Sequence, residues 1–290
     1  MSDSLDVAWI ALSLVPHIGT KTLTNLLAQV GSPEAVIHAP IDTLLKVRGI
    51  GKKTAQRIAA IDLASAERAI EQWQKVGVRI LTLQADTYPP LLKQLDDAPL
   101  TLFVYGNLER LFPLPAIAIV GTRRASREAR IQATRLAVFA VHQGYSVVSG
   151  LALGIDTAAH QGALSINMTP SIAVLGGGVQ TIYPPQNKGL AEQIADHGAL
   201  ISENAPNATA TASRLVIRNR IISGLCQHII VVESAADGGA MHAARAAVKQ
   251  GRTLHTLDLP ASGNQKLIAQ GVNILNPQNP HLPLPDISSE

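Results

Sequence analysis

The sequence has a single cysteine, Cys226, among 290 residues. One cysteine excludes an intramolecular disulfide and a cysteine-based zinc site. Cys226 lies between Leu225 and the apolar run 229–232, a setting that predicts a buried thiol. A reducing compartment fits this cysteine usage.

Long hydrophobic runs are also missing. The first 19 residues have no basic segment, and their apolar stretch is too short and too interrupted to span a membrane. We therefore expect a cytoplasmic protein with no membrane partner. A composition of 47% hydrophobic and 16% charged residues is typical of a folded protein. The net charge of +3 is only mildly basic, so a nucleic-acid partner must be inferred from where the charges lie.

The chain divides into two patterns. The first is helical and contains a weak internal repeat, the turns 15–21 and 47–53, with His17 where the second turn has Gly49. The second turn has the form of a helix-hairpin-helix turn, which can bind a phosphate or simply join two packed helices. The expected parts are a helical domain at 1–80, a connecting segment at 81–110 with a strand-like run at 102–106, a larger domain at 111–275 and a disordered proline-rich tail at 276–290.

The larger domain alternates β-branched runs with helical stretches. This alternation predicts an α/β fold with a doubly wound, mostly parallel sheet, because parallel strands need crossover helices. Ligands of such sheets bind outside the carboxyl ends of the strands. No Gly-x-Gly-x-x-Gly fingerprint follows the first strand, so no NAD, FAD or other cofactor is predicted. The expected strands are 117–120, 146–149, 172–175, 199–202, 229–232, 253–257 and 272–275, and the expected helices include 127–142, 155–164, 188–197 and 240–249.

Two arginine clusters occupy strand-to-helix junctions of this domain. One begins directly after the strand at 117–120 and contains Arg123, and the other contains Arg214, Arg218 and Arg220. Guanidinium groups match phosphate oxygens and remain charged at any working pH. Arginines on a surface are often only solvated or paired with carboxylates. Two clusters at the ends of strands favour a polyanionic ligand.

The sequence evidence for catalytic residues is weaker than the evidence for an anion site. Ser149, Asp156 and His160 can be imagined as a hydrolytic triad, but a nucleophile elbow needs Gly-x-Ser-x-Gly and here the serine precedes the glycine. Capping and packing explain these residues better. The nine histidines show no metal-ligand spacing. We therefore predict no catalytic residue and no metal, and we do not expect an enzyme.

Segments along nearly the whole chain resemble DNA-processing protein A, the DprA/Smf family. They are IAIVGTRRAS, YSVVSGLALGIDTAAHQGAL, IAVLGGGVQTIYPPQNKGL, LISENAP, RNRIISGL, IIVVESA and NQKLIAQGV, in that order. The resemblance implies a helical N-terminal domain of sterile-alpha-motif-like form followed by an extended Rossmann-like domain. It also implies a homodimer that binds and protects single-stranded DNA and loads RecA recombinase during natural transformation.

The family's DNA pocket can be carried over motif by motif. Thr122 replaces the serine of the Gly-Ser-Arg-x-x-Ser motif, and Lys188 corresponds to the lysine after the Tyr-Pro turn. Leu215 stands where an aromatic residue is often found, and leucine has no π face for a base. The resulting DNA-binding residues are Gly121, Thr122, Arg123, Ser126, Ser149, Gly150, Lys188, Leu215, Arg218, Asn219, Arg220, Gly238 and Gly239.

A second function comes from a different class, a nucleotide-binding or nucleotide-hydrolysing enzyme of the related Rossmann-like phosphoribohydrolase type. The loop 237–240 resembles the phosphate loop of those enzymes. Their catalytic glutamate is missing, because the helix that follows begins Met241-His242-Ala243-Ala244. The arginine clusters and the missing acid favour the nonenzymatic DNA binder.

Overall fold

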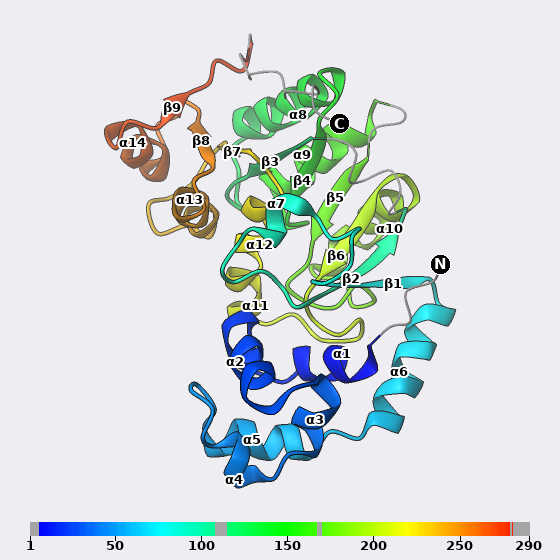
Figure 1. The fold of residues 1–290 in the computed structure, drawn as a ribbon. Helices are drawn as coiled ribbons and strands as arrows, with labels where there is room; N and C mark the ends of the chain where they lie inside the picture. Colours follow the sequence, from blue (N-terminus) through cyan, green and yellow to red (C-terminus); the bar gives the residue numbers. More distant parts are fainter. Residues whose placement is uncertain (1–5, 108–114, 167–169, 279, 281–290) are drawn as a thin grey trace.

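The computed structural model describes residues 6–107, 115–166, 170–278 and 280, and it places a small helical domain below a larger α/β domain (Figure 1). Asp6, Ser32 and Asp62 each accept a hydrogen bond from the first turn of the helix that follows them. The helices of the small domain are α1 Val7–Ser13, α2 Thr20–Val30, α3 Pro33–His38, α4 Ile41–Leu44, α5 Lys52–Ala59 and α6 Leu63–Lys75.

The repeated turns of this domain share an unusual backbone conformation. Gly49, in the turn before α5, has φ 96°, and His17, in the matching turn before α2, has φ 74°. A positive φ is costly for a residue with a side chain and easy for glycine. The two turns are therefore similar in backbone as well as in sequence, although only the second has glycine at this position.

The larger domain is built on one sheet. Within the described residues its strands follow the order β1-β2-β6-β5-β4-β3-β7-β8-β9. Strand β2 pairs antiparallel with β1 and β6, and all other neighbours are parallel. The strands are β1 Val78–Thr82, β2 Thr101–Gly106, β3 Ala116–Val120, β4 Ser146–Ser149, β5 Ser171–Val174, β6 Ala199–Ser202, β7 His228–Val231, β8 Thr253–Thr256 and β9 Asn273–Ile274.

Helices connect the strands. They are α7 Pro90–Lys93, α8 Arg127–His142, α9 Ile155–Leu164, the 3₁₀ turn η2 Pro185–Asn187, α10 Lys188–His197, α11 Ala212–Ile217, α12 Asn219–Gly224, α13 Ala240–Lys249 and α14 Ser262–Ala269. The predicted class, a doubly wound and mostly parallel α/β sheet after a helical domain, is confirmed. The four helices expected in the larger domain coincide with α8, α9, α10 and α13, and the seven expected strands differ from the observed ones by at most one residue at each end.

The first part of the sheet lies outside the expected larger domain. Strand β1 crosses the boundary expected at residue 80, and β2 falls in the connecting segment expected at 81–110. Because β2 is hydrogen-bonded to both β1 and β6, this part of the connecting segment lies within the sheet. The tail expected at 276–290 lies mostly outside the described residues.

Apolar layers cover both faces of the sheet. On one face, residues such as Ile117 and Val147 pack against α8 and α9. On the other, residues such as Ala118 and Val148 pack with α12 and α13. Burial on both faces explains why the central strands are continuous apolar runs without alternation. Cys226 is fully buried, as predicted, and burial raises the pKa of its thiol.

The helical domain is joined to the sheet by buried contacts. The Trp9 indole N–H donates to the Leu100 carbonyl at 2.9 Å, and the Thr20 hydroxyl donates to the Ala98 carbonyl at 2.7 Å. Ile10 and Ile70, from α1 and α6, belong to the apolar cluster that also contains residues of β1, β2, β5 and β6. The helical domain therefore packs on the sheet and is hydrogen-bonded to the segment just before β2.

Candidate nucleic-acid interface

A crevice opens where the order of the strands reverses. From β3 the sheet extends through β4 and β5 to β6, and the chain then returns to the other side of β3 with β7 and β8. Doubly wound sheets bind ligands at this position, outside the carboxyl ends of the strands. We call it the switch-point crevice; it measures about 640 Å³, and the residues that line it include Gly121, Thr122, Arg123, Arg124, Asp156, Tyr183, Leu215, Val216, Arg218, Asn219, Asp237, Gly238 and Gly239.

The loop after β3 carries Arg123, and hydrogen bonds hold the backbone of this loop in place. The Thr122 N–H donates to the Glu233 carbonyl at 2.7 Å, and the Glu233 carboxylate accepts from the Ser126 N–H at 2.8 Å. The Ser126 hydroxyl accepts from the Ala129 N–H at 3.1 Å and caps α8. Arg123 is exposed at the crevice. It is therefore placed for a charge-assisted contact with a phosphate.

Arg218 reaches the crevice from within the protein, with only 5% of its surface exposed. Its Nη1 donates to the Gly150 carbonyl and, at 2.6 Å, to the Val174 carbonyl. A Cβ atom on residue 150 would lie 2.4 Å from the Arg218 Nη2, so glycine at this position leaves room for the guanidinium. Arg218 thus joins the carboxyl ends of β4 and β5 and places positive charge in the crevice wall.

The buried carboxylate of Asp156 accompanies this cation. Its Oδ2 accepts from the backbone N–H groups of Gly150 at 3.2 Å and Ala152 at 3.3 Å. Burial raises the pKa of Asp156, and the charge of Arg218 opposes that rise. Burial lowers the pKa of Arg218, and Asp156 opposes that change in turn. The two groups hold the loop after β4 in place.

The three residues weighed as a hydrolytic triad are buried, and although the Ser149 and Asp156 side chains interact, the His160 ring pairs with a residue outside the three. The Ser149 hydroxyl donates to the Ile119 carbonyl at 2.6 Å, and the His160 Nδ1 pairs with the Ser171 hydroxyl at 2.7 Å. Burial, with a smaller effect from Arg218, lowers the pKa of His160 to about 3, so its ring is neutral at pH 7. This arrangement supports the packing interpretation.

The start of α13 forms another side of the crevice. Gly238, Gly239 and Ala240 line it, and no side chain caps the helix. The Met241 and His242 N–H groups donate to the Gly238 and Gly239 carbonyls, so α13 attracts an anion mainly through the positive end of its helix dipole. The Asn219 side chain donates to the Gly239 carbonyl at 3.4 Å, which links α12 to this loop. Positive charge therefore meets the crevice from α13 as well as from Arg123.

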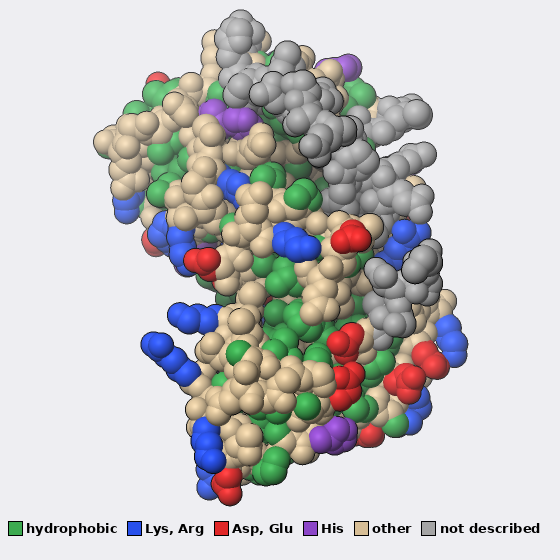
Figure 2. All heavy atoms as spheres, viewed as in Figure 1, with side chains coloured by type: hydrophobic (Ala, Val, Ile, Leu, Met, Phe, Trp, Pro, Cys, Tyr) green, Lys and Arg blue, Asp and Glu red, His purple; other side chains and the backbone are tan. Residues whose placement is uncertain are grey.

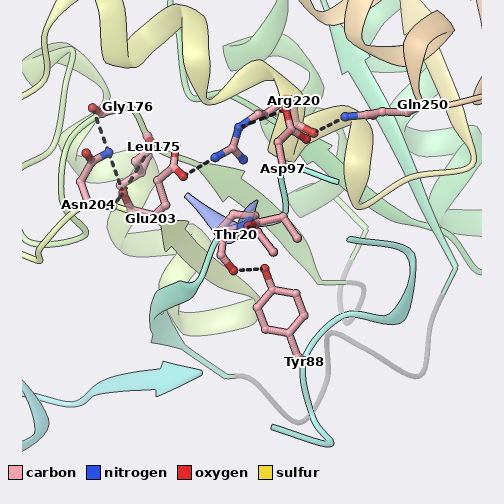
Figure 3. Close-up of polar contacts among 12 residues, drawn as sticks. Thr20, Tyr88, Asp97, Leu175, Gly176, Glu203, Asn204, Arg220 and Gln250 are labelled. Carbon is pink, nitrogen blue, oxygen red and sulfur yellow. Dashed lines mark hydrogen bonds and ion pairs between the residues drawn. The ribbon is translucent and has the colours of Figure 1, made fainter. Parts of the chain in front are cut away.

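Arg220 lies away from the crevice, although it is two residues from Arg218. Its Nη2 is 2.5 Å from the Glu203 Oε2, and its Nε is 3.9 Å from the Asp97 Oδ2 (Figure 3). It lines a second hollow of about 230 Å³ between the start of α2 and residues 96–101. Arg220 therefore links α12 to the segment before β2 at the junction of the two domains.

Some of the other predicted DNA-binding residues line the crevice and others lie outside it. Lys188 is exposed at the start of α10 and lines a third hollow, with Val76 and Tyr105. Gly150 borders a hollow of about 50 Å³ next to the crevice. Of the predicted residues, the crevice lining brings together Gly121, Thr122, Arg123, Leu215, Arg218, Asn219, Gly238 and Gly239, whereas Ser126, Ser149, Lys188 and Arg220 stand outside it. Their roles in DNA binding remain predictions.

Tyr183 and Arg124 are among the crevice residues that are absent from the predicted set. Tyr183 is 44% exposed and lines both the crevice and the small hollow beside it. Arg124 lines the crevice next to Arg123. Arg124 could have been found from the doubled arginine, whereas the Tyr-Pro-Pro turn carries no sign that its tyrosine faces the arginines.

Cationic side chains also gather on the surface. Figure 2 shows Lys and Arg along the left edge of the view, over both the helical and the α/β domain. Among the described residues, no group of three or more His, Cys, Asp or Glu side chains could hold a metal ion. Within the same part of the chain, every helix is too short or too polar to cross a bilayer.

Family models match both domains. Residues 79–282 match the family described as DNA recombination-mediator protein A, and residues 10–60 match a SAM-like helix-hairpin-helix tandem. The chain is 32% identical over 288 residues to Protein Smf of Synechocystis sp., an alignment that covers 96% of this chain and 72% of that protein.

Solved structures extend the likeness to three dimensions. DNA processing protein A from Streptococcus pneumoniae matches with a TM-score of 0.79 at 27% identity, over 94% of this chain and 95% of the other. DNA processing protein A from Helicobacter pylori, solved to describe its single-stranded DNA binding mode, matches with a TM-score of 0.63 at 28% identity, over 69% of this chain and 93% of the other.

Proposed function

Because this chain belongs to the DNA recombination-mediator protein A family, known as DprA/Smf, we propose that it binds single-stranded DNA in the switch-point crevice. The observation that carries the proposal is the convergence of exposed Arg123, buried Arg218 and the uncapped start of α13 on one crevice. Each of these groups attracts a phosphate.

The crevice offers contacts that do not depend on base sequence. Guanidinium and backbone N–H groups bind phosphates, which position a strand and carry no base code. Arg123 is exposed and Arg218 is fixed, so a strand would meet one adaptable and one rigid cation. We therefore expect binding that varies little with sequence and weakens as salt is raised.

The finer functions rest on the family. As a DprA/Smf member, the protein would act in the cytoplasm as a homodimer that protects incoming single-stranded DNA and loads RecA recombinase on it during natural transformation. A symmetric pair would offer two crevices to one strand, which raises avidity without new contacts. Size-exclusion chromatography with light scattering tests the dimer. RecA loading is tested by asking whether the protein shortens the lag of RecA's DNA-dependent ATP hydrolysis on strands coated with single-strand-binding protein.

The decisive experiment is a binding titration. A labelled oligonucleotide and its duplex are compared at two salt concentrations. The single strand should bind more tightly, and the logarithm of its affinity should fall with the logarithm of salt at a slope of about −0.7 per phosphate neutralised. Equal affinity for both forms, or no salt dependence, would contradict the proposal.

We further propose that the protein is not an enzyme. The first turn of α13 has no acidic residue, where a nucleotide phosphoribohydrolase needs its glutamate. Incubation with nucleoside monophosphates should release no free base, as followed by chromatography. Release of base that depends on Asp237, the exposed acid of the crevice, would favour the enzyme instead.

A further inference from the structure

The switch-point crevice contains an exposed aromatic ring that a phosphate site does not need. Tyr183 is 44% exposed and lines the crevice together with Arg123 and Leu215. We propose that Tyr183 is the surface on which a DNA base stacks, and that it gives the crevice its preference for single strands. The inference rests on the proposed function and names the residue that sets its selectivity.

The position of Tyr183 among other crevice residues supports stacking. The same small hollow is lined by Tyr183, Pro184, Leu215 and Arg123. Arg123, Tyr183 and Leu215 also line the larger crevice, so a nucleotide in the crevice would place its phosphate near the Arg123 guanidinium and its base near the Tyr183 ring and Leu215. Leu215 itself is packed over Gly176, where an added Cβ would lie 2.9 Å from the Leu215 Cδ2. Leu215 thus provides an apolar surface, and Tyr183 provides the π face that leucine lacks.

The loop that carries Tyr183 is anchored on both sides. Before it, the Gln180 N–H donates to the Pro206 carbonyl at 2.8 Å. After it, the buried Asn187 side chain donates to the Leu151 carbonyl and to the Thr157 hydroxyl, both at 2.9 Å. A platform held in this way loses little freedom when a base stacks on it, which favours binding.

Stacking explains selectivity that phosphate contacts cannot. Both single strands and duplexes present phosphates, but the bases of a duplex are already paired and stacked inside it. An exposed ring can therefore engage only an unpaired base. Removing the ring should reduce single-strand affinity and leave duplex affinity unchanged.

The test compares four proteins on two strands. Wild type, Tyr183→Leu, Tyr183→Phe and Tyr105→Leu are titrated with a labelled oligonucleotide and with the same strand made of abasic sites. Tyr105 is the matched control, because it is an exposed tyrosine, at 39%, outside the lining of the switch-point crevice. Far-UV circular dichroism and thermal unfolding confirm that each variant is folded.

The expected result is a loss of about tenfold or more in affinity for the normal strand in Tyr183→Leu. Tyr183→Phe and Tyr105→Leu should bind like the wild type. The abasic strand should bind wild type and Tyr183→Leu equally. The salt slope, which is the slope of the logarithm of affinity against the logarithm of salt concentration, should be the same in all four proteins. Emission of 2-aminopurine in the strand should be quenched by wild type and by Tyr183→Phe, and not by Tyr183→Leu.

Three results would overturn the inference. Wild-type affinity in a folded Tyr183→Leu protein excludes a stacking role, as does an equal loss on the abasic strand. If Tyr183→Phe loses as much affinity as Tyr183→Leu, the hydroxyl and not the ring is responsible. A wild-type protein that binds no single strand at all contradicts the proposed function itself, which separates that failure from the failure of Tyr183.

Discussion

The switch-point crevice and the domain junction both contain arginines of one Arg-Asn-Arg motif, yet they differ in charge. Three arginines, Arg123, Arg124 and Arg218, line the crevice together with two acids, Asp156 and Asp237. Arg220 lies at the junction, where its hollow is also lined by Lys21 and by three acids, Asp96, Asp97 and Glu203. The crevice is therefore suited to a polyanion, whereas the acids at the junction neutralise the positive charge of Arg220 and Lys21.

The geometry of the chain separates the two arginines. Successive helical residues are rotated by about 100°, so residues two apart point to nearly opposite sides. Arg218 directly follows α11 as its C-cap, and Arg220 lies in α12. A cluster of arginines in the sequence consequently need not form one anion site. The following predictions break or sharpen this contrast, from the largest expected effect to the smallest.

Arg218→Met should cause the largest loss of stability. The substitution leaves the carbonyls of Gly150 and Val174 without their donor and Asp156 as a buried carboxylate without its cation. Leaving a buried charge without compensation costs about 3–5 kcal/mol. Urea unfolding measures the change, and adding Asp156→Asn should restore part of the loss. An unchanged free energy of unfolding would show that Arg218 has no structural role.

Acid should destabilise the α/β domain through His160. Its pKa is lowered to about 3 in the folded protein and is about 6.5 when unfolded. The unfolded state therefore binds more protons below pH 6.5, so stability falls from there towards pH 3, by at most about 1.4 kcal/mol per pH unit. Urea unfolding at pH 7 and pH 5 should show a smaller pH dependence in His160→Gln. The exposed residue His142 offers the control, His142→Gln, which should keep the wild-type dependence.

Arg123→Ala should weaken single-strand binding without loss of stability. Arg123 is exposed, and hydrogen bonds to charged groups contribute about 1.5–3 kcal/mol. Affinity should fall by tenfold or more, and the salt slope should become shallower by about 0.7. Arg135→Ala, an exposed arginine of α8 outside the crevice, is the control. An unchanged slope in Arg123→Ala would remove this residue from the phosphate contacts.

Arg220→Ala should act on stability and leave the salt slope unchanged. Its side chain is 20% exposed and held by Glu203, so its loss should cost about 1 kcal/mol, between the values for surface and buried pairs. Thermal unfolding and the salt titration are measured on the same samples. A slope shallower by about 0.7 would mean that Arg220 leaves Glu203 and reaches a phosphate, and the contrast between crevice and junction would then fail.

Leu215→Phe should have the smallest effect. The half-buried leucine lines the crevice, so an aromatic ring there would add a stacking surface worth about 1 kcal/mol, roughly fivefold in affinity. The salt slope should not change. Weaker binding by a folded Leu215→Phe protein would indicate that the residue belongs to the packing over Gly176 and does not face a base.

The regular elements around the crevice follow from local sequence. The run at 117–120 reads as a buried strand because apolar side chains cover both of its faces, and the helix at 127–142 begins with Ser126 as its cap. The arginine after the first strand falls at the crevice for a related reason. In a doubly wound sheet, the residue that follows a strand's carboxyl end lies at the ligand side, so Arg123 could be placed from the order of elements alone.

By itself, the sequence determined the fold class, the family and the position of most central strands and helices, because hydrophobic periodicity and motif order are properties of neighbouring residues. Only the tertiary structure decided which side chains meet. It placed Arg220 with Glu203, Lys188 beside Tyr105 and Tyr183 in the crevice. These pairings join segments far apart in the chain, so they depend on how the sheet and its loops pack and not on the local pattern.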